Sequence, residues 1–142
     1  MSARTETRVR YPETDRMGVA WHGHFLAWFE LGRTEWMREI GLPYGELEDL
    51  HGVLFPVIEA GARYVAPARY DEVLDIDTRL TAFTAARVRF AYRVFRRSDG
   101  ALLAEGFTEH AAVDRAGRPR RLPGDIRSRI RERASREEAG RS

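Results

Sequence analysis

A carboxylate and two histidines stand around the predicted start of a helix: Asp15 precedes it in a polar loop, and His22, Gly23 and His24 are its first residues. The first backbone N–H groups of a helix have no partner within it and carry the positive end of its dipole. They could therefore hold the oxyanion that forms when a carbonyl is attacked. The nearby carboxylate could act as nucleophile or general base. This chemistry needs neither a metal nor a cysteine.

Each of these residues also has an ordinary structural interpretation. An aspartate in a loop after Pro12 is often a turn or helix-capping residue. His22 and His24 could form a metal pair, but no third ligand is in view, so no metal site is predicted. The aromatic residues of the helix are expected to be core residues, whereas Trp21 precedes the helix and is a candidate for lining a substrate pocket.

The helix itself is predicted from about Gly23 to Ile40. Its apolar residues recur at spacings of three and four, which places them on one face: Phe25, Trp28, Phe29, Gly32, Trp36 and Ile40. Gly32 lies within this face at a cost of about 1 kcal/mol in helix propensity relative to alanine. We expect it to allow a close approach of the helix to a sheet.

Strand-like segments surround this helix in the sequence. One runs from Thr5 to Tyr11, and after a short helix at residues 45–52 four more follow at about 53–64, 72–84, 87–97 and 102–114. Such long strands can curl around one apolar helix, which indicates an α+β fold in a single domain of residues 1–142. We expect the core to span about 5–130, a short basic helix at 124–133, and a frayed end at 137–142.

Composition narrows the class of protein. The chain has no cysteine, so disulfides and thiolate chemistry are excluded. No stretch is apolar enough to span a membrane, and the first residues do not resemble a signal peptide, so a cytoplasmic protein without membrane contact is expected. All 24 basic residues are arginine, and many lie near the C-terminus. They are not interleaved with aromatic residues, so nucleic-acid binding is not predicted.

Two segments together resemble a known family. The run from Thr14 to Gly41, TDRMGVAWHGHFLAWFELGRTEWMREIG, and the later segment Tyr64–Leu74 are similar to the 4-hydroxybenzoyl-CoA thioesterase family in its YbgC-like branch. The resemblance covers about Thr5 to Ile130. It implies the hot-dog fold, in which a curved five-stranded antiparallel sheet wraps a long central helix, with strand order in sequence β-α-β-β-β-β.

The resemblance also implies roles for individual residues. Asp15 corresponds to the catalytic carboxylate, and the backbone N–H of His22 helps to form the oxyanion site. Trp21, Gly23 and His24 stand next to these residues and are expected to contact the substrate, although the family commonly has asparagine at the position of His24 and tyrosine at that of Phe25. The family also suggests two arginines, whose planar groups suit phosphates, as contacts to coenzyme A. They are Arg87 and Arg89.

The expected activity is hydrolysis of an acyl-CoA thioester to free acid and coenzyme A, with no cofactor or metal. The expected assembly is a homodimer or homotetramer whose site lies between subunits. Two alternatives stay open: a thioesterase acting on acyl carrier protein, which the basic C-terminal segment would suit, and a non-catalytic acyl-CoA binder. The sequence does not distinguish aromatic from aliphatic acyl groups.

Overall fold

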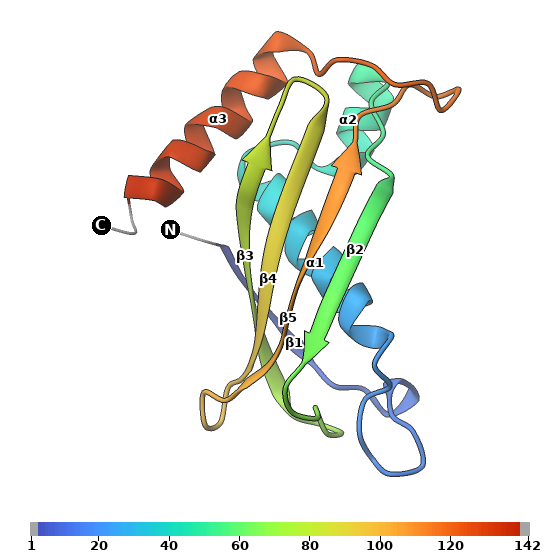
Figure 1. Ribbon diagram of the computed structural model, residues 1–142, viewed down its shortest axis with the longest axis vertical. Helices are drawn as coiled ribbons and strands as arrows, with labels where there is room; N and C mark the ends of the chain where they lie inside the picture. The colour runs from blue at the N-terminus through green and yellow to red at the C-terminus, as the bar shows by residue number, and fades with distance from the viewer. Residues whose placement is uncertain (1–2, 140–142) are drawn as a thin grey trace.

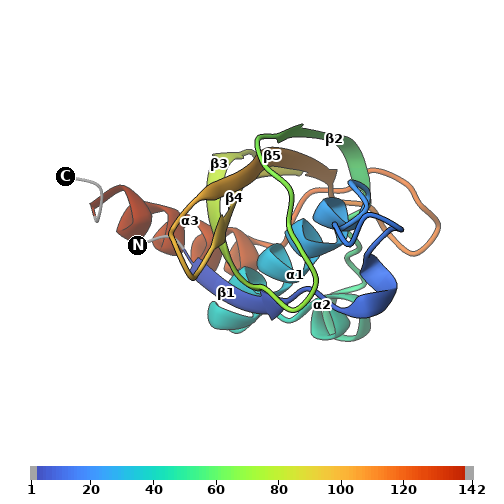
Figure 2. The same ribbon diagram turned by 90° about the horizontal axis from the view of Figure 1, so that it is seen from below.

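A computed structural model describes residues 3–139 of the chain. One antiparallel sheet of five strands, in the order β1-β3-β4-β5-β2, curves around helix α1 (Figures 1 and 2). The elements are β1 (Ala3–Arg8), the short 3-10 helix η1 (Tyr11–Glu13), α1 (His24–Glu39), α2 (Tyr44–His51), β2 (Val57–Tyr64), β3 (Val73–Phe83), β4 (Arg87–Arg96), β5 (Leu102–Ala111) and α3 (Gly124–Ala139). Among these residues, no helix is both long and apolar enough to cross a membrane.

Helix α1 packs its predicted apolar face against the concave side of the sheet. The buried residues of this face are Phe25, Trp28, Phe29, Gly32, Trp36 and Met37. Gly32 is required because a Cβ atom there would overlap the Thr78 hydroxyl and press on Ile76 of β3. The expected close approach of helix and sheet is therefore confirmed.

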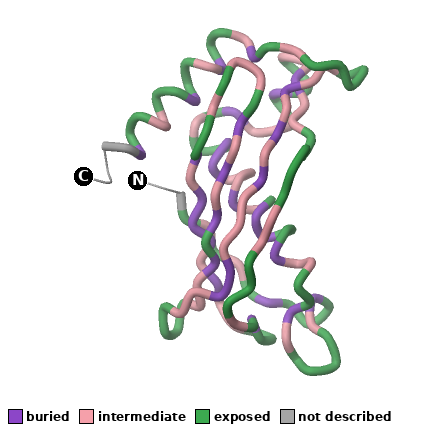
Figure 3. Tube along the Cα trace, in the orientation of Figure 1, coloured by how far each residue is buried: buried purple, intermediate pink, exposed green. Residues whose placement is uncertain are grey.

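The strands bury alternate residues, as the period of two requires. In β4, Val88, Phe90, Tyr92 and Val94 are buried and face the helix. The residues between them lie on the outer face of the sheet, where exposed and half-buried side chains dominate (Figure 3). Chemistry on the inner face is therefore confined to the few polar groups that accompany this apolar core.

Some strand boundaries differ from the prediction. β1 ends at Arg8 because residues 11–13 form η1 rather than extended backbone. β2 begins at Val57 because Pro56 has no backbone N–H to donate to a neighbouring strand. The weak turn predicted at residues 84–86 is stabilised by Thr84, whose hydroxyl oxygen accepts hydrogen bonds from the N–H groups of Ala86 and Arg87.

Helix α3 corrects the expectation of a frayed C-terminal end. It continues to Ala139, and Ile126 and Ile130 are fully buried. Glu137 is only 2% exposed, and its carboxylate accepts hydrogen bonds from the indole N–H of Trp36 and the backbone N–H of Leu80. The prediction was wrong for residues 137–139, and the core extends beyond residue 130. Residues 140–142 lie outside the described part of the chain.

Candidate functional site

Asp15 lies in a compact loop between η1 and α1. The loop is closed by a bridge between Thr14 and Ala20, and the N–H of Asp15 donates to Val19 O at 2.9 Å. One carboxylate oxygen of Asp15 accepts a hydrogen bond from the Met17 N–H at 2.8 Å. The side chain is exposed, and within residues 3–139 its second oxygen has no hydrogen bond. The turn thus fixes the carboxyl group while leaving one oxygen open to solvent or a ligand.

The second family-like segment holds this loop in place. The N–H of Ala20 donates to Ala68 O at 2.7 Å, and the N–H of Tyr70 donates to Gly18 O. A bridge between Val19 and Arg69 completes the contact. The two segments that carry the resemblance, far apart in the sequence, therefore meet at one end of α1.

Glu13 is a site-supporting residue that the sequence did not single out. It is 5% exposed, and its two carboxylate oxygens accept hydrogen bonds from the Arg10 N–H at 2.7 Å and the Trp28 indole N–H at 3.3 Å. This buried carboxylate ties the Asp15 loop to α1. Its only signal in the sequence is its position two residues before Asp15, which does not distinguish it from an exposed loop residue.

The start of α1 offers two free backbone donors. The N–H of His24 donates to Trp21 O at 3.0 Å, and that of Phe25 donates to His22 O at 3.2 Å. The N–H groups of His22 and Gly23 donate no hydrogen bond to any part of the chain that the structure describes. They lie at the positive end of the helix dipole, where an oxyanion would be stabilised.

Aromatic rings surround these two donors. Trp21 is 55% exposed, and its ring centroid lies 4.8 Å from that of His22 and 5.8 Å from that of His24. A Cβ atom on Gly23 would overlap the Trp21 ring, so glycine is needed for this packing. Trp21 therefore lies outside the core, unlike Trp28 and Trp36, which are buried as predicted.

His22 and His24 are close in sequence but have no further ligand near them. No group of three or more histidines, cysteines, aspartates or glutamates within residues 3–139 could hold a metal ion. His22 is exposed, and its backbone oxygen accepts a hydrogen bond from the Tyr64 hydroxyl at 3.0 Å. This bond links the start of α1 to the end of edge strand β2.

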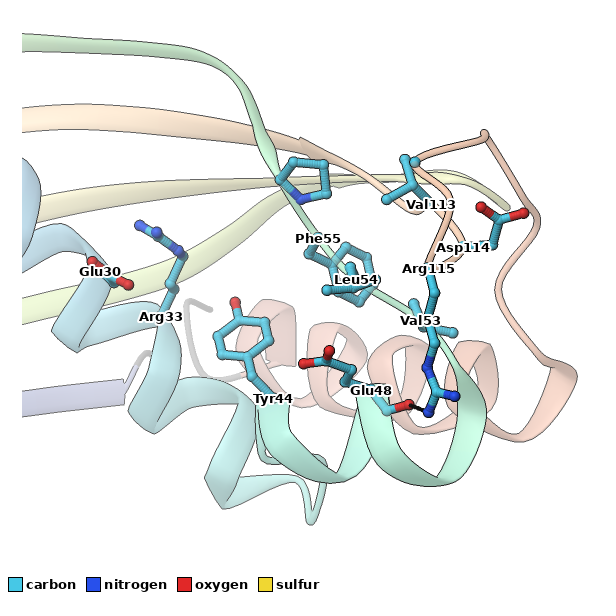
Figure 4. A pocket seen from close by; sticks show the side chains of 12 residues that line it. Glu30, Arg33, Tyr44, Glu48, Val53, Leu54, Phe55, Val113, Asp114 and Arg115 are labelled. Carbon is cyan, nitrogen blue, oxygen red and sulfur yellow. Dashed lines mark hydrogen bonds between the residues drawn. The ribbon is translucent and has the colours of Figure 1, made fainter.

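Two cavities lie beside α1 at different positions along its length. The smaller, about 320 Å³, lies beside the Asp15 loop and is lined by residues that include His22, Phe25 and Tyr64. The larger, about 570 Å³, lies near the start of β2 (Figure 4). Arg33 of α1 and Tyr44 of α2 extend from the helices toward the strands, and Phe55 lies in the opposing wall.

Arg87 and Arg89 do not join Asp15 within one chain. They pair with residues 111 and 109 of β5, whereas Tyr64, beside the Asp15 site, pairs with residue 104, so the arginines lie toward the other end of the sheet. Both form ion pairs with Glu109, at 3.5 and 3.7 Å. The Arg89 guanidinium also covers the ring of Phe107 at 4.1 Å. The other predicted residues, Asp15 and residues 21–24, do gather at one end of α1.

Comparison with known proteins gives a consistent result. The profile of the thioesterase-like superfamily matches residues 9–130. The acyl-CoA thioester hydrolase YbgC of Escherichia coli is 33% identical over 124 residues, which is 87% of this chain and 91% of that protein.

Solved structures show the same fold. A hypothetical protein from Thermus thermophilus is 41% identical, with a TM-score of 0.86 over 93% of this chain and 98% of its own. The DHNA-CoA thioesterase of Staphylococcus aureus is 27% identical, with a TM-score of 0.89 over 97% of this chain and 94% of its own. These are hot-dog proteins, so the predicted α+β fold of this chain is confirmed.

Proposed function

The chain belongs to the thioesterase-like superfamily, and from this membership we infer that it is an enzyme that hydrolyses acyl-CoA thioesters to free acid and coenzyme A. The groups at the start of α1 are the observation that supports a catalytic site within this chain. There, the Asp15 carboxylate has one unengaged oxygen, and the free N–H groups of His22 and Gly23 lie at the helix start. A carboxylate and an oxyanion site are the groups that thioester hydrolysis requires.

The proposed reaction places the thioester carbonyl oxygen on the free N–H groups of His22 and Gly23. Asp15 either removes a proton from water as it attacks the carbonyl carbon or attacks that carbon itself. In both cases the negative charge moves to the carbonyl oxygen, where the two amides stabilise it. The carbon–sulfur bond then breaks, and coenzyme A leaves as a thiolate that takes up a proton. If Asp15 is the nucleophile, water then hydrolyses the mixed anhydride formed on it, which releases the free acid and restores the carboxylate. Trp21 and His24 would border the acyl-CoA near this point.

The shape of the sheet supports a dimer. Within residues 3–139, β2 is an edge strand with β5 as its one neighbour, and it carries exposed apolar side chains at Val57 and Ile58, which are 45% and 46% exposed. Long uncovered edges invite pairing with another strand. Antiparallel pairing of two β2 strands about a two-fold axis would bring the start of one strand beside the end of the other.

This pairing has a consequence for the site. The larger cavity lies at the start of β2, and the Asp15 site lies at the end of β2. A two-fold pairing of these strands would therefore place the larger cavity of one subunit beside the partner subunit's Asp15. We propose that the acyl group enters this cavity while the thioester lies at the helix start of the partner. The same two-fold symmetry would allow Arg87 and Arg89 of one subunit to approach a coenzyme bound to another subunit.

The dimer predicts a mass at least twice that of the 16.3 kDa chain in sedimentation experiments. Ile58→Asp should shift the protein toward monomer and reduce turnover together, because a charge would be placed in the pairing edge. Leu50→Asp is the matched control, since Leu50 is 73% exposed and belongs to α2 and not to the pairing strand β2. A monomer that keeps full activity at low concentration would rule out the shared site.

The activity is tested directly by following free thiol released from a panel of acyl-CoA esters of different length. Release should proceed equally in buffer treated with a chelator, because the proposed groups are a carboxylate and backbone amides. Activity that is lost with chelator and restored by zinc would contradict this chemistry. Binding of the esters without any release would instead favour the non-catalytic binder.

An acyl-carrier-protein thioesterase is a second candidate. Exposed arginines on α3, including Arg131 and Arg136, would attract an acidic carrier protein. Rates on the same acyl chain attached to coenzyme A and to a carrier protein distinguish the two substrates. A cytoplasmic location, expected from the sequence, belongs to the same proposal.

A further inference from the structure

A chain of hydrogen bonds crosses the core between α1 and the segment before β2. The Tyr92 and Thr108 hydroxyl oxygens are 2.6 Å apart, Thr108 Oγ1 is 2.8 Å from His110 Nε2, and His110 Nδ1 is 3.0 Å from Phe55 O. At the other end lie the hydroxyls of Tyr92 and Tyr44, where burial raises the pKa of both and the nearby Arg33 guanidinium acts in the opposite direction. The three central residues, Tyr92, Thr108 and His110, are each no more than 2% exposed.

Each hydrogen bond in this series has one donor and one acceptor that can be assigned. Burial lowers the pKa of His110 to about 4, so its ring is neutral at pH 7. A carbonyl can only accept, so Nδ1 must donate to Phe55 O and Nε2 must accept from the Thr108 hydroxyl. The Thr108 oxygen then accepts from the Tyr92 hydroxyl, beside which the Arg33 guanidinium lies.

The two ends of this series of hydrogen bonds lie in the same cavity. Arg33 and Phe55 both line the larger cavity, one from α1 and the other from the opposite wall (Figure 4). Since His110 and Thr108 stand on β5 and Tyr92 on β4, the sheet itself fixes the position of both walls. A chain of buried hydrogen bonds in which every member is satisfied is rigid.

Arg33 has donors left for a ligand. A guanidinium carries five N–H groups, more than the two neighbouring hydroxyls, of Tyr44 and Tyr92, could accept. Among the carboxylates of residues 3–139, none forms an ion pair with Arg33. Much of the remaining wall is apolar, with Val53, Leu54 and Pro56. The carboxylates of Glu30, Glu48 and Asp114 and a second arginine, Arg115, also line the cavity. Apolar wall residues beside an arginine favour a ligand that is apolar along its length and carries an oxygen acceptor where it meets Arg33.

We propose that Arg33 determines acyl specificity by binding an oxygen at the far end of the acyl group, and that Tyr92, Thr108 and His110 are positioning residues that aim it. This proposal rests on the proposed thioesterase function and on the shared site. It names the substrate class as acyl-CoA esters with a terminal hydroxyl or carboxylate. The oxygen accepts a hydrogen bond from Arg33 in either case.

The test compares kcat/KM for hexanoyl-CoA, ω-hydroxyhexanoyl-CoA and adipoyl-CoA, which differ only at the far end. The wild-type enzyme should prefer one of the oxygen-bearing esters about 10-fold or more, as one hydrogen bond to a charged group allows. Preference for the hydroxy ester identifies a hydroxyl ligand, and preference for adipoyl-CoA identifies a carboxylate. Arg33→Met should reduce this preference to about one while hexanoyl-CoA is still hydrolysed.

The positioning role of these hydrogen bonds is tested by Thr108→Val, which keeps the shape of the side chain but removes its hydroxyl. We expect the preference to collapse as in Arg33→Met, and Thr108→Ser to restore it, since serine keeps the hydroxyl. A role in stability alone would change the melting temperature but not this ratio. If Thr108→Val does not fold, Tyr92→Phe breaks the same chain one residue earlier.

The outcomes separate this inference from the proposed function. Hydrolysis of all three esters at similar kcat/KM would overturn the specificity proposal and leave the thioesterase function intact. An unchanged preference in folded Thr108→Val or Tyr92→Phe would overturn the positioning role. Failure to hydrolyse any acyl-CoA ester would overturn both.

Discussion

Asp15→Asn should lower kcat about 100-fold or more, the usual effect of losing a positioned general base. An amide cannot remove a proton from water, and it cannot replace a carboxylate as nucleophile. The fold should survive, because the side chain is exposed and an amide oxygen can still accept the hydrogen bond from the Met17 N–H. The measurements are kcat, the melting temperature and the dissociation constant of a non-hydrolysable acyl-CoA analogue. Melting and binding should change little.

A matched control comes from a second turn of the same kind. Asp99 is also exposed, and its carboxylate accepts a hydrogen bond from the N–H two residues later, that of Ala101, at 3.0 Å. Asp99→Asn should leave kcat unchanged, because this turn is not at the start of α1. If Asp15→Asn melts normally and keeps more than about a tenth of the wild-type kcat, the expected loss of a general base is absent. The next carboxylate to test would then be Glu30 on α1.

Glu137→Ala should destabilise the protein by about 3 kcal/mol. It removes the acceptor for two buried donors, the Trp36 indole N–H and the Leu80 backbone N–H, and each unsatisfied buried donor costs roughly 1–3 kcal/mol. For a chain of this length the melting temperature should fall by roughly 10 °C. Urea unfolding followed by circular dichroism gives the free energy directly.

The control for this change lies on the same helix. Glu132 is exposed on α3, so Glu132→Ala should change stability by no more than about 0.5 kcal/mol. Glu137→Gln keeps an acceptor and should have an intermediate effect. A Glu137→Ala protein as stable as the wild type would show that α3 does not stabilise the core through this residue.

Much of the fold could be predicted because its signals are local. The three- and four-residue spacing of α1 and the alternation in β4 each appear within one segment, and the structure confirms both. The end of α3 could not be predicted in this way. Its sequence is highly charged, and only the distant partners Trp36 and Leu80 make burial of Glu137 favourable.

The same difference between local and distant signals applies to the candidate site. Asp15 and residues 21–24 are neighbours in sequence, so the start of one helix was enough to bring them together. The series of hydrogen bonds beside Arg33 brings together residues from two helices, two strands and the segment before β2. No pattern within any of these elements reveals it. Arg87 and Arg89 show the converse limit, because a suitable residue type does not reveal at which end of a sheet it lies.

Helix α1 is tied at both ends by the same kind of bond, an indole N–H donating to a buried carboxylate. Trp28 donates to Glu13 at the site end, and Trp36 donates to Glu137 at the far end. Proteins often open locally before they unfold as a whole. With single-tryptophan variants, fluorescence from Trp28 would report opening of the Asp15 loop, and fluorescence from Trp36 would report detachment of α3. The two ends of one helix could then be followed as separate unfolding events, with Trp21 as an exposed reference.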